Sequence, residues 1–190
     1  MKHSLLFKYI LPFMQWYVLM ILITIGIDYL LHRLQLVWVG RYLGYVGTFI
    51  VLLSFIYSLR KRNRMESVSP KKLLMLHEYL AWGGSILLLV HAGIHFNAIL
   101  PWIAIVMLLI TVASGLVGKF ILKRAANTLN ANKQALVNAG LGQEAIDKKL
   151  FFDSVMVEAM DEWRSVHIPL AFILGFFSLL HIITIFMFGK

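Results

Sequence analysis

Residues 77–91 read HEYLAWGGSILLLVH, and residues 167–181 read HIPLAFILGFFSLLH. Each stretch begins and ends with a histidine, so the two histidines of each pair are fourteen residues apart. Fourteen residues of α-helix make almost four turns and rise about 21 Å, so both histidines of a pair face the same way. Two such helices side by side would form two histidine–histidine pairs, one above the other. Two haems with bis-histidine ligation need that geometry.

The composition indicates a membrane protein. The chain has 190 residues, of which 60% are hydrophobic, and its mean hydropathy is +0.80. A soluble domain of this size could not bury that much apolar surface. Cysteine is absent, which excludes disulfides, cysteine-ligated clusters and thioether-attached c-type haem. Any haem must therefore be a non-covalent b-type haem.

Five stretches are long enough to cross a bilayer. They are Tyr9–Leu31, Tyr42–Leu59, Leu74–Phe96, Ile99–Leu122 and Val166–Phe188. The first follows basic residues, as a signal peptide does, but it is too long for an h-region and has no small-residue cleavage site. We therefore expect it to be retained. The predicted fold is all-α: residues 1–190 form one integral membrane domain, a polytopic bundle of five transmembrane helices with a four-helix haem-binding core.

Basic residues set the expected orientation. The net charge of +9 clusters beside the apolar spans, which indicates membrane topology rather than nucleic-acid binding. With the N-terminus in the cytoplasm, all of the 18 lysines and arginines except Arg33, Arg41 and Lys190 lie inside. The C-terminus is then periplasmic, in a bacterial inner membrane.

This orientation makes the third and fifth spans parallel, so their first histidines meet and their second histidines meet. We expect His77 to pair with His167 near the cytoplasmic face, and His91 to pair with His181 near the outer face. Ionisable residues are rare within spans and usually mark function. The four histidines are therefore the predicted iron ligands.

Small residues accompany the histidines. Gly84 lies midway between His77 and His91, Ala81 and Ala171 each follow a first histidine by four residues, and Ser178 lies three residues before the last one. They predict room for a porphyrin on the ligand face. The alternative is that small residues simply let membrane helices pack closely.

Haem propionates need cationic partners. On the cytoplasmic side Arg60, Lys72 and Arg164 are candidates, and on the outer side Arg41 and His95 are. The alternative is that the basic residues only anchor the spans according to the positive-inside rule.

Two further histidines have open roles. His95 lies one turn beyond His91, where it could replace His91 as a ligand, contact a propionate, line a quinone pocket or bond to interfacial water. His32 ends the first span, where the interfacial role is favoured.

Residues 123–165 form the expected cytoplasmic amphipathic segment. Its first part extends the fourth span as a helix to about Ala139 and is broken by Gly140 and Gly142, and a second helix begins at about Gln143. An apolar stripe follows at helical spacing, and consists of Phe152, Val155, Met156, Ala159, Met160 and Trp163. We expect this helix to lie on the membrane interface or over the inner haem, with partner docking as the alternative.

Three stretches carry a family resemblance. HAGIHF at 91–96, SGLVG at 114–118 and WRSVHIP at 163–169 resemble prokaryotic diheme cytochrome b membrane subunits. The histidine pattern is also similar to that of the transmembrane domain of ferric reductases and NADPH oxidases, and of cytochrome b. The resemblance covers the second to fifth spans and implies electron transfer, often with multihaem c-type cytochromes. In the oxidases a sixth span and a flavin domain follow the fifth span, and these 190 residues contain no G-x-G-x-x-G loop, so the pattern departs from theirs.

The expected function is therefore transmembrane electron transfer through two haems b in a respiratory oxidoreductase complex. The chain would exchange electrons between the quinone pool and a periplasmic cytochrome c or iron–sulfur partner. With both axial positions filled, the irons have no open site for substrate, which favours a relay. One alternative is a ferric-reductase-like subunit fed by a separate cytoplasmic flavoprotein. The other is a transporter whose histidines bind Zn²⁺, against which the separation of about 21 Å and the lack of intramembrane carboxylates near the pairs argue.

Overall fold

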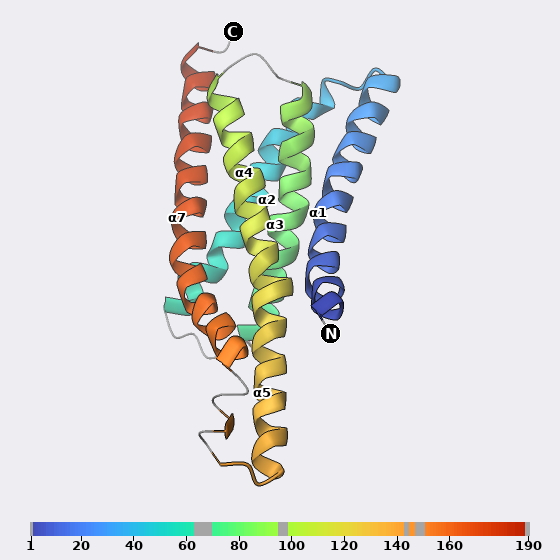
Figure 1. Ribbon diagram of the computed structural model, residues 1–190. Helices are drawn as coiled ribbons and strands as arrows, with labels where there is room; N and C mark the ends of the chain where they lie inside the picture. The colour runs from blue at the N-terminus through green and yellow to red at the C-terminus, as the bar shows by residue number, and fades with distance from the viewer. Residues whose placement is uncertain (1, 63–69, 95–98, 143–144, 147–150, 189–190) are drawn as a thin grey trace. The chain divides into compact units, whose positions relative to one another are not determined.

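In a computed structural model of the protein, the described residues form helices joined by short turns, with no strand among them (Figure 1). The structure describes the backbone of residues 2–62, 70–94, 99–142, 145–146 and 151–188, and the side chains in these ranges except those at 2–9, 56–62, 70–71, 94, 121–129, 151–161 and 164. In chain order the elements are α1 (Lys2–Arg33), α2 (Val39–Arg62), α3 (Pro70–Ile94), α4 (Ile99–Val117), the π-helical turn η1 (Gly118–Leu122), α5 (Lys123–Asn138) and α7 (Phe151–Phe188). The all-α fold class is confirmed for these residues.

Four helices are long and apolar enough to cross a membrane. The spans are Ile10–Arg33, Lys72–Gly93, Ile99–Phe120 and Ser165–Phe188, and each matches a predicted span to within a few residues. The predicted second span falls on α2, whose described apolar part, Val39–Phe55, is shorter. Large apolar side chains along these helices are exposed, as lipid-facing residues are. The chain is accordingly a multi-pass membrane protein.

The chain divides into two compact units. The first unit comprises residues 1–17 and 113–172, which include the end of α4, η1, α5 and the first part of α7. Its buried residues include Leu116 and Phe120, and the ring of Phe120 stacks on that of Trp16 with centroids 6.5 Å apart. The ammonium group of Lys119 lies 5.7 Å from the centroid of Trp16. Because Lys119 and Phe120 belong to η1, the π-turn is enclosed by aromatic packing.

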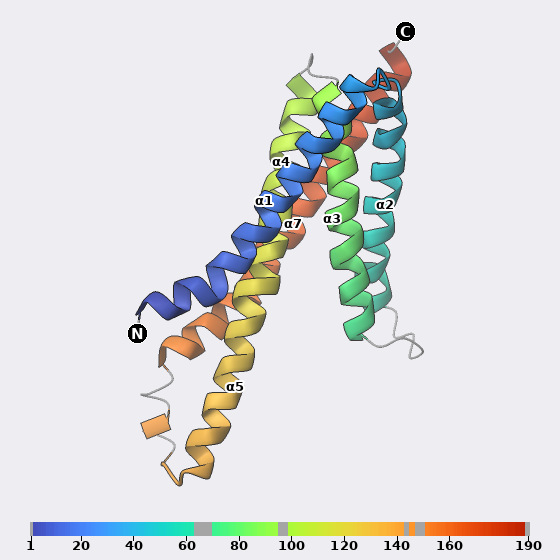
Figure 2. The ribbon, with the colours of Figure 1, turned by 90° about the vertical axis from the view of Figure 1, so that its right-hand side faces the viewer.

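The second unit comprises residues 18–112 and 173–190. Its core is formed by the antiparallel pair α2 and α3, which lie side by side along their length (Figure 2). Ile86, Leu89 and Val90 of α3 are buried, as are Ser54 of α2 and Ser85 of α3. The hydroxyl groups of both serines donate to carbonyls of their own helix, so they bring no unsatisfied donor into the apolar interior.

Two helix ends use the same backbone motif. At the end of α1 the amide of Leu36 donates to the carbonyl of Leu31, with Gln35 at φ +57°. At the end of α5 the amide of Leu141 donates to the carbonyl of Leu136, with Gly140 at φ +75°. A left-handed residue with this bond ends a helix and turns the chain. The predicted helix end at about Ala139 is confirmed within one residue.

The helix that contains the fifth span begins earlier than the span itself. The sequence predicted a separate amphipathic helix before Val166, whereas α7 runs without interruption from Phe151 to Phe188. Pro169 lies inside α7, where its ring removes one amide donor but does not end the helix. The side chains of the predicted stripe from Phe152 to Met160 lie outside the described residues, so the stripe stays a prediction.

Candidate functional site

The two histidines of α3, His77 and His91, both reach main-chain oxygens of α2. His77 Nδ1 lies 3.0 Å from the carbonyl oxygen of Ser54, and His91 Nδ1 lies 2.9 Å from that of Gly40. A carbonyl oxygen can only accept, so each Nδ1 carries a proton and donates it. A neutral imidazole protonated at Nδ1 has its lone pair on Nε2, which is how metal-ligating histidines are usually held.

A stripe of small residues on α2 makes this approach possible. Gly40, Gly44, Gly47 and Ser54 fall on one face of the helix, at spacings of four, seven and fourteen residues from the first. A Cβ added at Gly44 would lie 2.8 Å from two imidazole atoms of His91. Any larger residue at 44 would therefore push the ring away. Sequence reasoning missed this stripe, although the G-x-x-x-G pattern at 40–44 is a known signal for close helix packing.

Gly84 takes part in the same helix pair. A Cβ added at Gly84 would lie 2.7 Å from Val51 Cγ2 and 3.1 Å from Ile50 Cγ2, both of α2. At the neighbouring Gly83 an added Cβ would meet nothing within 4 Å. Close packing, the alternative weighed from the sequence, is thus a physical reason for glycine at 84. Its predicted role in making room for a porphyrin stays a prediction.

His167 has a different set of neighbours, all in the first unit. Its Nδ1 lies 3.2 Å from Ser114 Oγ, and its ring stacks on that of Trp163 at 5.0 Å and 19°. The indole of Trp163 donates to the Ser114 carbonyl at 2.9 Å. Trp163 therefore contacts both His167, through ring stacking, and Ser114, whose hydroxyl lies beside His167 Nδ1. A Cβ added at Gly118 would collide with the Trp163 ring, so glycine at 118 admits the indole.

The remaining predicted ligand, His181, is partly buried on α7 and belongs to the second unit, as does His91. The hydroxyl of Thr184 donates to the main-chain carbonyl of His181 at 2.7 Å, and both residues belong to α7. Ala81, Ala171 and Ser178 are also partly buried. The pairing of the four histidines and the role of these small residues stay predictions.

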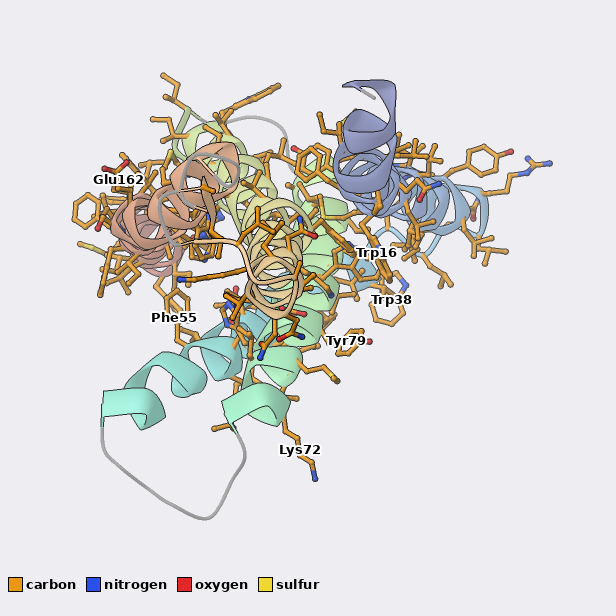
Figure 3. The ribbon with its side chains drawn as sticks, turned by 60° about the horizontal axis from the view of Figure 1, so that its bottom comes forward. Trp16, Trp38, Phe55, Lys72, Tyr79 and Glu162 are labelled. Carbon is orange, nitrogen blue, oxygen red and sulfur yellow. The ribbon has the colours of Figure 1, made fainter. Side chains whose placement is uncertain are left out.

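The candidate propionate partners are only partly described. Arg41 is exposed in the first turn of α2. Lys72 is exposed near the start of α3 and extends away from α2, as does Tyr79 (Figure 3). The side chains of Arg60 and Arg164, and the whole of His95, lie outside the described residues. Their predicted contacts with propionates therefore stay predictions.

One sequence-based expectation is wrong. The spans were taken to lack carboxylates near the histidine pairs, but Asp28 lies inside the first membrane-spanning stretch. An added Cβ at Gly93 would be 3.2 Å from Asp28 Oδ1, and Gly93 is two residues beyond His91. His32, one turn further along α1, has its Nδ1 2.9 Å from the Asp28 carbonyl oxygen. Asp28 lies near the end of a long apolar stretch, so the mean hydropathy of the span does not reveal that it contains a carboxylate.

Among the described residues, no three His, Cys, Asp or Glu side chains gather into a group that could hold a metal ion. A bis-histidine haem needs only two protein ligands for each iron, so the donor set described above fits it. Comparison with protein-family models, with curated proteins and with solved structures finds no match to this chain.

Proposed function

We propose that the chain is a five-span membrane subunit that binds two haems b and carries electrons across the membrane. The observation that supports this most is the setting of His77 and His91. Each donates from Nδ1 to a main-chain oxygen of α2, at positions fourteen residues apart on one helix. A fixed tautomer at both ends of this spacing is what two axial ligands on one helix need.

The chain's own residues would hold each iron and tune it. His77 and His91 would ligate from α3, and His167 and His181 from α7, in the pairs that parallel spans imply. Donation from Nδ1 makes an imidazole a stronger electron donor at Nε2 and keeps the ring from rotating. When bound, the haems would supply reversible one-electron iron chemistry.

The proposed electron path joins the quinone pool to a periplasmic cytochrome c or iron–sulfur subunit. The N-terminus would be cytoplasmic and the C-terminus periplasmic, in a bacterial-type inner membrane, because nearly all basic residues then lie inside. A lipid-soluble quinone can reach either end of a span from within the bilayer. The exposed apolar faces of α1 and α7 are open to such a ligand.

Haem content tests the proposal directly. A pyridine haemochrome assay on the purified chain should give close to two haems per polypeptide, with the visible spectrum of bis-histidine b-type haem. A ratio near zero together with tightly bound zinc would overturn it in favour of the transporter alternative. Two haems that only a cytoplasmic flavoprotein reduces, with quinols inactive, would replace the quinone assignment by the ferric-reductase-like alternative.

A further inference from the structure

Asp28 is a carboxyl group held inside an apolar helix. Its neighbours in α1 include Ile25 and Tyr29, which are 59% and 67% exposed on a helix that spans the membrane. Oδ1 of Asp28 is buried and accepts no hydrogen bond from any residue that the structure describes. An unsatisfied polar atom at this depth costs stability. Carboxylates retained within spans usually serve a function.

The carboxyl group lies against the part of α3 that carries His91. Oδ1 would be 3.2 Å from a Cβ at Gly93, so any larger residue at 93 would make the Asp28 carboxyl shift. Gly93 follows His91 by two residues, which is about 3 Å along a helix and about 200° around its axis. Asp28 therefore lies at the level of His91, the ligand of the proposed outer haem, but on another side of α3.

The carboxyl group of Asp28 is also partly accessible from outside the protein. The side chain of Asp28 is 32% exposed although Oδ1 is buried, so its exposed surface lies on the remaining atoms, which include Oδ2. His32 Nδ1 is 3.6 Å from Oδ1, and its side chain is 51% exposed. Of the titratable groups in the described residues, His32 on α1 is the one shown within 4 Å of the Asp28 carboxyl. Its Nδ1 donates to the Asp28 main-chain carbonyl, so a proton on Asp28 leaves from the exposed part of the carboxyl to water.

We propose that Asp28 accepts the protons of a quinol that is oxidised at the His91 end of the protein. This inference rests on the proposed function, which supplies the oxidant. The quinol O–H bond breaks, its proton moves to Asp28 Oδ2 and then to water, and the second hydroxyl proton follows the same route. The quinol's two electrons reduce two ferric irons to the ferrous state, so one quinol gives one quinone, two protons and two ferrous irons.

A cation is a poorer ligand for this place than a quinol. Asp28 and His32 supply one carboxylate and one imidazole, and the described residues contain no group of three such ligands. The surrounding face of α1 is apolar and exposed, which suits a lipid-soluble ring.

The test uses the full-length, haem-loaded protein in detergent, with ubiquinol-1 and a short-chain menaquinol as probes. Stopped-flow absorbance follows haem reduction in wild type, Asp28→Asn and Asp28→Glu. Thr24→Val is the matched control, because Thr24 lies one turn earlier on α1 and bonds only within that helix in the described structure. Asp28→Asn should slow reduction roughly 10²-fold, the lower end of what a positioned proton acceptor contributes. Asp28→Glu and Thr24→Val should stay close to wild type, and added formate should restore part of the Asp28→Asn rate.

Two measurements separate this inference from the proposed function. Haem content and reduction by dithionite should be the same in all variants. Infrared difference spectra on adding quinol should show a protonated carboxyl band that Asp28→Asn removes. If wild type holds two haems and quinol reduces Asp28→Asn at the wild-type rate, the inference falls and the proposed function stands. Loss of haem in wild type itself would overturn both.

Discussion

At the scale of single residues, the tautomer of an imidazole is the feature with most consequence. Main-chain oxygens receive the Nδ1 protons of His77 and His91, whereas His167 faces the hydroxyl of Ser114. A carbonyl can only accept, but a hydroxyl can either donate or accept. The two proposed ligands on α3 are therefore oriented more firmly than His167 on α7.

The four proposed ligands should fall into two pairs by mutation. We expect His77→Ala and His167→Ala to remove the same haem, and His91→Ala and His181→Ala to remove the other. Each variant should keep about one haem per chain by pyridine haemochrome assay, with the surviving signal resolved by electron paramagnetic resonance. Loss of a haem in His95→Ala but not in His91→Ala would move the ligand by one turn. Loss of the same haem in His77→Ala and His181→Ala would refute parallel spans.

Ser114 should tune the iron that His167 ligates. Without the hydroxyl in Ser114→Ala, the imidazole loses electron-donating character, so the midpoint potential of that haem should rise. A hydrogen bond worth about 1 kcal/mol corresponds to a shift of about 40 mV for one electron. Redox titration of both haems measures it. Thr111→Val is the control, because its hydroxyl bonds within α4, and an equal shift there would contradict the assignment.

At the scale of elements, the contact between α2 and α3 depends on glycines that face each other. Gly47 and Gly84 lie at this contact, where an added Cβ on either would be 3.2 Å or less from atoms of the other helix. Because His77 and His91 donate across the same contact, any widening of the helix pair also lengthens both ligand hydrogen bonds. Packing and ligand orientation are thus one property of this helix pair.

Two adjacent glycines on α3 give a matched test of that packing. Gly84→Ala should destabilise the protein by about 1–3 kcal/mol, because the added methyl overpacks against Val51. Gly83→Ala meets nothing within 4 Å, so it should be neutral or stabilise by up to about 1 kcal/mol through helix propensity. Thermal unfolding of the purified protein in detergent compares them. Equal effects of the two substitutions would show that Gly84 does not lie at a tight contact.

The sequence could predict the helices better than the contacts between them. Four spans were placed within a few residues because a long apolar run needs no tertiary information. The hydrogen-bond partners of His77 and His91 are main-chain carbonyl oxygens, which every residue has, so no pattern of side chains in the sequence predicts which residues supply them. The sequence shows Asp28 as a polar residue in an apolar stretch, but it does not show that the carboxyl group lies against Gly93 of α3. The continuity of α7 from Phe151 into the fifth span was also beyond local patterns, since the amphipathic stretch before Val166 was predicted as a helix of its own.

At the scale of the whole molecule, the order of spans fixes which loops share a side. The five proposed spans would place residues 34–38 on the side opposite the N-terminus, and residues 123–150 on the same side as the N-terminus. The proposed pairing of histidines needs α3 and α7 to be parallel, which this topology provides. The proposed topology can be tested without haem.

The absence of native cysteine allows single-cysteine labelling without background. Asn130→Cys and Gln35→Cys both alter exposed positions. In right-side-out vesicles an impermeant maleimide should label Gln35→Cys, and should label Asn130→Cys only after the membrane is permeabilised. Labelling of both positions from the same side would show that the number of spans between them is even, which would contradict the proposed five-span topology.

The hydrogen bonds of His77 and His91 end on main-chain oxygens, and this affects how the protein can change over generations. A codon change at Gly40 or Ser54 replaces a side chain but leaves the carbonyl that accepts the bond. A single-nucleotide change at Ser114 can erase the hydroxyl partner of His167. Inherited variation at the partner residue should therefore alter the His167 contact readily, whereas the acceptors of His77 and His91 persist whatever side chain stands at 54 or 40.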